Sequence, residues 1–102
     1  MKEIAAEAFY HKWMDQKLTI LDVREVDEFL DGHVKGSQNT PLSQLESLYP
    51  NLEKNKEYYI LCHAGQRSLR ASHFLQDKGF QVVNVKGGVT AFPGQLVKGE
   101  EE

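Results

Sequence analysis

The chain has 102 residues, 40% apolar and 26% charged, which is typical of one compact globular domain with a single hydrophobic core. Its net charge is −3 and its basic residues are scattered among acidic ones, so we expect no nucleic-acid partner. No apolar run has transmembrane length and the first residues lack the apolar core of a signal peptide, so we expect no membrane partner and a cytoplasmic, reducing location.

The chain is predicted to begin with a short strand at Ile4 and a helix. The helix is indicated by apolar residues at intervals of three and four, which place on one face Ala6, Phe9, Tyr10, Trp13 and Met14. We expect Trp13 and Met14 to pack in the core. The continuous apolar run 18–23 then predicts a buried strand at the centre of a parallel sheet.

Charged residues lie at the end of this strand. We expect Asp22 and Arg24 to form an ion pair or hydrogen-bond network that holds the neighbouring loops, and Asp22 is also placed to face a site there. Residues 26–30 support a short helix, with Glu25 and Glu28 on its solvated face.

The middle of the chain is predicted to be less regular. Residues 34–40 suggest a loop with a short strand, and Pro41 begins a short helical stretch that ends at 49–51. A charged connection over 53–57 leads to the aromatic and β-branched run 58–61, which predicts another strand.

The chain's only cysteine, Cys62, lies where that strand ends and a helix over 68–78 is predicted. A strand-to-helix loop turns backbone N–H groups inward, and the helix dipole adds positive potential, so the loop suits an anion. Arg67 adds a positive charge, and Gly65 permits a positive φ in a tight turn. The same field favours Cys62 as a nucleophilic thiolate.

The last predicted elements are a strand over 81–85 and a helical turn over 89–92, separated by Gly87 and Gly88. Strands alternating with short helices predict an α/β fold with right-handed crossovers and a site at the carboxyl ends of the strands. Cys62 lies at such an end.

Two motifs, their order and a closing Gly-Gly carry a family resemblance. The stretch 21–37 (LDVREVDEFLDGHVKGS), the loop 62–68 (CHAGQRS) and the closing Val-x-Val-x-Gly-Gly at 83–88 resemble the rhodanese (sulfurtransferase) homology domain. The resemblance implies a three-layer α/β domain whose mostly parallel central sheet is flanked by helices. It implies a single domain over 1–102 with a core of about 4–94, and the acidic residues at 98–102 read as a solvated tail.

The resemblance also implies an activity, thiosulfate sulfurtransferase. Cys62 would take sulfane sulfur from a donor such as thiosulfate or a persulfide, and the resulting Cys62 persulfide would pass it to cyanide, a thiol or an acceptor protein. No cofactor is required. The anion-binding loop would comprise His63, Ala64, Gly65, Gln66, Arg67 and Ser68, with Arg67 orienting the donor and Ser68 supporting the thiolate.

The histidines have more than one interpretation. His63 could form a Cys–His dyad, but adjacent residues in a tight loop usually point apart, so we favour exposure at the rim of the pocket. His33, in the upstream motif, suggests a structural contact. Neither these two nor His11 and His73 have metal-ligand spacing with Cys62, so we expect no metal.

Two rival functions and two departures from the family pattern remain. Phosphatase and arsenate-reductase relatives carry a loop one residue longer than this Cys-x4-Arg interval, whereas a non-catalytic interaction module or persulfide carrier is compatible with it.

Lys35 replaces a common proline and Phe92 a common tryptophan, and both changes look tolerable for the fold.

Overall fold

The computed structural model, in which residues 1–100 are described, contains a five-stranded sheet whose strands are all parallel. Its order is β1-β5-β4-β2-β3. The strands are β1 (Lys2–Ala5), β2 (Thr19–Asp22), β3 (Gln38–Asn39), β4 (Glu57–Leu61) and β5 (Gln81–Lys86). The predicted parallel sheet is thus confirmed, but β4 takes the central place that we expected for β2, which lies between β4 and the edge strand β3.

Within residues 1–100, four α-helices and three 3-10 turns lie between and after the strands. They are α1 (Ala6–Asp15), α2 (Val26–Asp31), η1 (Leu42–Gln44), α3 (Leu45–Leu48), η2 (Tyr49–Asn51), α4 (Gln66–Asp77) and η3 (Val89–Ala91). Helix α4 begins two residues before the predicted start, because Gly65 at φ 101° already turns the chain into the helix.

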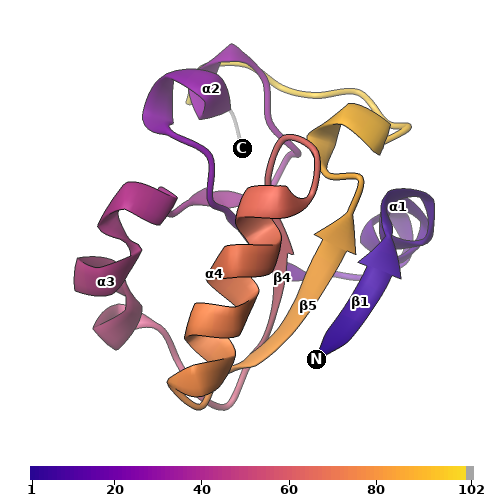
Figure 1. Ribbon diagram of the computed structural model, residues 1–102. Helices are drawn as coiled ribbons and strands as arrows, with labels where there is room; N and C mark the ends of the chain where they lie inside the picture. The colour runs from indigo at the N-terminus through magenta and orange to yellow at the C-terminus, as the bar shows by residue number, and fades with distance from the viewer. Residues whose placement is uncertain (101–102) are drawn as a thin grey trace.

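Side chains of the central strand alternate between two apolar layers. Tyr58 and Ile60 pack with α3 and α4, whereas Tyr59 and Leu61 pack with α1 on the other face. Figure 1 shows α4 in front of the sheet and α1 behind it, which gives the expected three layers. Cys62 follows the alternation and belongs to the α4 layer.

Helix α1 corrects one prediction. Its buried residues are Ala6 and Phe9, and Trp13 is partly buried against the core, but Met14 is 56% exposed. At 3.6 residues per turn Met14 lies about 80° around the helix from Ala6, whereas Trp13 lies only about 20° away. The buried stripe is therefore narrower than the sequence spacing suggested.

The two departures from the family pattern are accommodated on this face. Phe92 is 7% exposed and its ring centroid lies 5.3 Å from that of Tyr10 and 5.5 Å from that of Trp13. The Lys35 carbonyl accepts a hydrogen bond from Trp13 Nε1 at 2.9 Å. An aromatic side chain thus still packs at position 92. At position 35 the contact with Trp13 uses only the backbone carbonyl, so it does not depend on which side chain is present.

Helix α2 lies at the end of the sheet where the strands point (Figure 1). The segment after η3 returns to it, since Val97 bridges with His33 and the Gly99 N–H donates to the Leu30 carbonyl at 2.7 Å. The predicted solvated tail is therefore held at Gly99, while residues 101–102 lie outside the described residues. Within 1–100, no helix has both the length and the apolar character needed to cross a membrane.

Candidate active site

Cys62 follows β4 directly, and its loop folds back around its sulfur. The Gly65 N–H donates to Sγ at 3.1 Å, and the thiol donates to Ser68 Oγ at 3.3 Å. Cys62 is 1% exposed and Ser68 is fully buried. A donor on one side and a hydroxyl on the other can hold either a thiol or a sulfur anion in a fixed position.

The turn at Gly65 requires glycine. Its φ of 101° is disfavoured for other residues, and an added Cβ would lie 3.0 Å from the Gly87 backbone nitrogen. The positive φ expected from the sequence is thus present, and it starts α4 immediately after the sulfur-binding N–H.

A second segment supports the loop from the side of η3. The Val89 N–H donates to the Cys62 carbonyl at 2.8 Å, and the Thr90 N–H and hydroxyl donate to the His63 carbonyl at 3.0 and 2.8 Å. Gly88 makes this approach possible, because a Cβ there would lie 2.6 Å from the His63 carbonyl oxygen. The sequence analysis identified the closing Gly-Gly motif but not this contact, and no sequence signal pointed to Thr90.

Arg67 has a partner that the sequence analysis did not identify. Its guanidinium donates to both carboxylate oxygens of Glu28, from Nη1 at 2.7 Å and from Nη2 at 2.8 Å. The expectation that Glu28 belongs to a solvated helix face is therefore wrong. Glu28 is the anion that balances a cation at the start of α4, so no bound ligand is needed to explain Arg67.

Glu28 is also tied to its own helix. It accepts a hydrogen bond from the Glu25 N–H at 3.1 Å and completes a capping box at the start of α2. The Glu25 carboxylate accepts the other hydrogen bond of this capping box, from the Glu28 N–H, and it also accepts one from the Ser43 hydroxyl at 2.7 Å. Glu25 therefore has contacts within the protein that the expected solvated helix face did not include. The hydrogen bonds from Arg67 lower the pKa of Glu28 from 4.5 to about 2, and the same contacts raise the pKa of Arg67.

Asp22 and Arg24 form the predicted ion pair beneath the site. Arg24 Nη2 lies 2.8 Å from Asp22 Oδ2 and also donates to the Gly32 carbonyl at 2.8 Å. Both side chains are buried. The pair joins the end of β2 to the end of α2, and Asp22 faces Arg24.

The other predicted residues divide into exposed and structural positions. His63, Ala64 and Gln66 are exposed. His63 Nε2 lies 3.3 Å from Thr90 Oγ1, which keeps its ring near η3 at the rim. His33 is buried, stacks on Phe29 with ring centroids 3.8 Å apart, and its Nδ1 lies 2.9 Å from the Phe29 carbonyl.

A cleft of about 340 Å³ adjoins the Cys62 loop. It is lined by Arg24, Glu28, Asp31, Gly32, His63, Val89 and Leu96. The cleft therefore lies between α2, the Cys62 loop and the segment around η3. Across residues 1–100, no three His, Cys, Asp or Glu side chains gather as a metal site.

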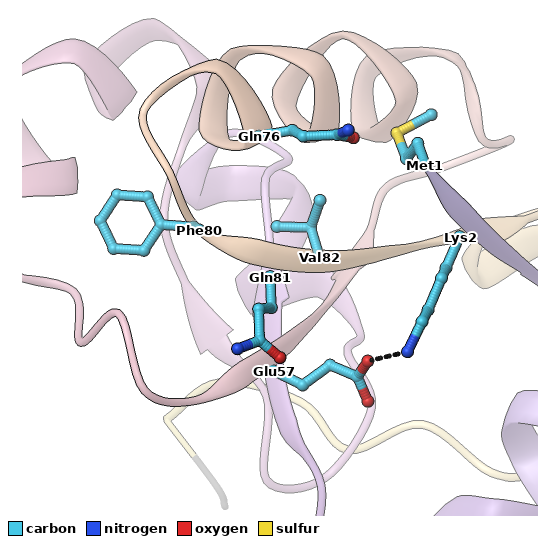
Figure 2. Close-up of a pocket in the computed structure, with 7 residues that line it drawn as sticks. All are labelled: Met1, Lys2, Glu57, Gln76, Phe80, Gln81 and Val82. Atoms are coloured by element: carbon cyan, nitrogen blue, oxygen red, sulfur yellow. Dashed lines mark hydrogen bonds and ion pairs between the residues drawn. The ribbon is translucent and has the colours of Figure 1, made fainter.

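A pocket of about 210 Å³ lies at the opposite, amino end of the strands (Figure 2). Lys2 and Glu57 pair across it at 3.0 Å, with Met1 and Gln76 on its other side. The side chains that line it within the described residues include no cysteine or histidine. This pocket is therefore separate from the Cys62 loop, which follows the carboxyl end of β4.

A parallel α/β sheet with a cysteine loop between its central strand and the following helix is the arrangement that the rhodanese resemblance implied. The family model described as "Rhodanese-like domain" matches residues 5–95. The chain therefore belongs to the rhodanese-like domain family, as the two motifs suggested.

Three similar proteins illustrate this membership. The chain is 40% identical over 95 residues to "Putative sulfur carrier protein YrkF" of Bacillus subtilis, covering 91% of this chain but only 51% of that protein. It is 33% identical to "Putative sulfurtransferase YtwF" of the same organism, covering 93% of each. A crystal structure of a rhodanese-like domain protein from Staphylococcus aureus superimposes with a TM-score of 0.88 at 31% identity, covering 96% of this chain and 98% of that one.

Proposed function

We propose that this protein is a sulfurtransferase that carries sulfane sulfur as a persulfide on Cys62. Family membership and the names of the two Bacillus subtilis relatives support sulfur transfer in general. The observation that carries the specific proposal is the position of the Cys62 sulfur between the Gly65 N–H and the Ser68 hydroxyl. A cytoplasmic location remains a prediction from the sequence.

In the first half-reaction the Cys62 thiolate attacks the outer sulfur of a donor. With thiosulfate, a bond forms between Cys62 Sγ and that sulfur, the donor's S–S bond breaks, and sulfite leaves with the bonding electrons. The product is the Cys62 persulfide anion. No oxidant, metal or cofactor enters this balance.

In the second half-reaction an acceptor attacks the outer sulfur of the Cys62 persulfide. Cyanide would leave as thiocyanate and a thiol would leave as a persulfide, and in both cases Cys62 returns to the thiolate. An acceptor protein could present its thiol in the cleft beside His63, which adjoins the Cys62 loop.

The loop's contribution is electrostatic. The Gly65 N–H already points at the sulfur, and the start of α4 adds the positive end of a helix dipole, so both favour negative charge on Cys62 or on the sulfur it carries. His63 is better suited to the rim than to proton transfer, because its ring lies next to Thr90 and its carbonyl is held by η3.

A persulfide carrier is the second candidate, and it is favoured by the 40% identity to a protein named as a sulfur carrier. The chain spans about half of that protein's length, so the longer protein's activity does not transfer directly. Multiple turnovers with free cyanide would support the enzyme, whereas a single loading released only to one protein thiol would support the carrier.

Intact mass of the purified protein tests the proposal. Treatment with a sulfane-sulfur donor should add one sulfur, about 32 Da, to the wild type, and cyanide or dithiothreitol should remove it. Cys62→Ser should gain nothing. A wild type that gains no sulfur from thiosulfate or from a persulfide would refute the proposal.

A further inference from the structure

We propose that Glu28 is a specificity-determining residue that directs the Cys62 site away from small dianionic donors such as thiosulfate and toward persulfides of thiols. This inference rests on the proposed function, since it concerns which donor loads Cys62.

The cation that would attract a dianion is already engaged. Arg67 uses both terminal nitrogens in its two short contacts with the Glu28 carboxylate. Both side chains are about one third exposed, at 33% and 35%. A small anion in the cleft must therefore compete for Arg67 with the Glu28 carboxylate, which belongs to the same chain and is already aligned with the guanidinium.

The second cation beside the cleft is engaged as well. Arg24 is buried, forms the ion pair with Asp22 and donates to the Gly32 carbonyl. Its charge is balanced within the protein, and it cannot turn toward a ligand without leaving the Asp22 carboxylate buried and unpaired.

The remaining charge on the cleft lining is negative. Asp31 is exposed there, while His63 adds an imidazole at the rim. With Arg67 and Arg24 each matched by a carboxylate, Asp31 leaves an excess of negative charge. A dianion that approaches the Cys62 loop through this cleft meets repulsion with no free guanidinium on the cleft lining to offset it.

A persulfide of a thiol avoids this difficulty because its reacting end carries at most one negative charge. The Cys62 thiolate attacks the outer sulfur of R–S–SH, the bond between Cys62 and that sulfur forms as the donor's S–S bond breaks, and R–S⁻ leaves. The proton stays on the transferred sulfur, so the product is Cys62–S–SH. The Gly65 N–H and Ser68 suit this small, uncharged group.

The test compares rates of Cys62 loading, followed by intact mass, with thiosulfate and with 2-hydroxyethyl persulfide. Glu28→Gln keeps an oxygen that can accept the Glu25 N–H but releases the Arg67 charge. We expect the ratio of the thiosulfate rate to the persulfide rate to rise about tenfold, as one newly free cation beside an anion would produce. A general loss of structure would lower both rates and would leave this ratio unchanged.

Two further variants make the result specific. Asp27→Asn removes the same charge from an exposed position on α2 outside the cleft lining, and it should leave the ratio unchanged. The double variant Glu28→Gln/Arg67→Gln keeps a neutral pair of the same net charge, and its ratio should stay within about threefold of the wild type.

The outcomes separate the two proposals. If the wild type is loaded by a donor but Glu28→Gln does not raise the ratio, or Asp27→Asn raises it equally, the role of Glu28 is refuted and the sulfurtransferase proposal stands. A double variant whose ratio of thiosulfate rate to persulfide rate falls far below that of the wild type would also refute it, because Arg67 would then already serve the dianion. If neither donor loads the wild type, both proposals fail.

Discussion

Ser68 and Ser72 lie one turn apart on the buried side of α4, yet only Ser68 is hydrogen-bonded. Ser68 Oγ accepts a hydrogen bond from the Cys62 thiol, whereas Ser72 Oγ has no hydrogen-bond partner among residues 1–100. The two positions share their chemistry and burial and differ in contact with sulfur. They form a matched pair for measuring what the hydroxyl does for Cys62.

We predict that Ser68→Ala slows sulfur loading of Cys62 by about threefold to tenfold, the effect of losing one hydrogen bond of roughly 1 kcal/mol. Ser72→Ala should leave the rate unchanged and should not destabilise the protein, because it removes a buried hydroxyl without a partner. Single-turnover loading measured by mass, with chemical denaturation beside it, checks both. Equal rates in the two variants would mean that Ser68 does not assist the sulfur.

At the scale of elements, the site depends on the contact between η3 and the Cys62 loop. Gly88 has φ 57°, and a side chain there would overlap the carbonyl oxygens of Cys62 and His63. Gly99 has a similar φ of 66° with nothing within 4 Å of an added Cβ. Gly88 also has a ψ of −155°, a combination open essentially to glycine alone, so comparing the two measures the clash and the special backbone conformation of Gly88 together, relative to a positive-φ glycine in open space.

We expect Gly99→Ala to cost about 1 kcal/mol of unfolding free energy and Gly88→Ala about 2 kcal/mol more than that. Gly88→Ala should also slow the loading of Cys62, because the loop must shift to admit the methyl group. Urea denaturation and the mass assay measure the two effects. A Gly88→Ala protein as stable and as fast as Gly99→Ala would show that the contact with η3 is dispensable.

The ion pair between Glu28 of α2 and Arg67 of α4 predicts that the stability of the folded protein depends on pH. Since the pKa of Glu28 falls from 4.5 to about 2 on folding, the unfolded state binds its proton first as pH decreases. The stabilisation is therefore complete above about pH 5 and is lost as pH falls toward 2. Because both partners are about one third exposed, we expect it to be only about 1 kcal/mol.

Wild type and Glu28→Gln, denatured at a series of pH values, provide the comparison. The stability difference between them should be constant from pH 7 to about pH 5 and should shrink below that value, because only the wild type has this carboxyl to protonate. A difference that did not change down to pH 3 would contradict the ion pair as described.

At the scale of the whole molecule, the sheet separates two apolar layers. Ile20 packs in the α1 layer and Ile60 in the α4 layer, and both are at most 2% exposed. Ile20→Val and Ile60→Val should each cost about 1 kcal/mol, and their effects should add within about 0.5 kcal/mol in the double variant. Denaturation of the three variants tests this, and a larger coupling would mean that the layers do not pack independently.

Much of this architecture could be predicted, because strands and helices are encoded by nearby residues. The apolar run 58–61, the cysteine after it and the helical stretch 68–78 are local features, and they correctly predicted the strand, the loop and the helix. The resemblance of 21–37 and 62–68 to the rhodanese family supplied the topology. A single domain over 1–102 stays a prediction.

The errors concern features that local patterns do not encode. The bond between Glu28 and Arg67 joins residues 39 positions apart, and that between Thr90 and His63 joins residues 27 apart, so spacing carries no sign of either. Met14 matched the helical period but lies at the margin of the buried stripe, where the neighbouring elements decide exposure. Tertiary contacts therefore decided these positions.

The central claim is that the Cys62 persulfide is an intermediate that passes its sulfur on. The most direct measurement is a single turnover, in which protein loaded with sulfur and freed of donor is mixed with cyanide. We predict about one equivalent of thiocyanate per protein and the return of the unmodified mass, with no thiocyanate from Cys62→Ser. Loaded protein that keeps its sulfur, or thiocyanate formed equally by Cys62→Ser, would contradict the account.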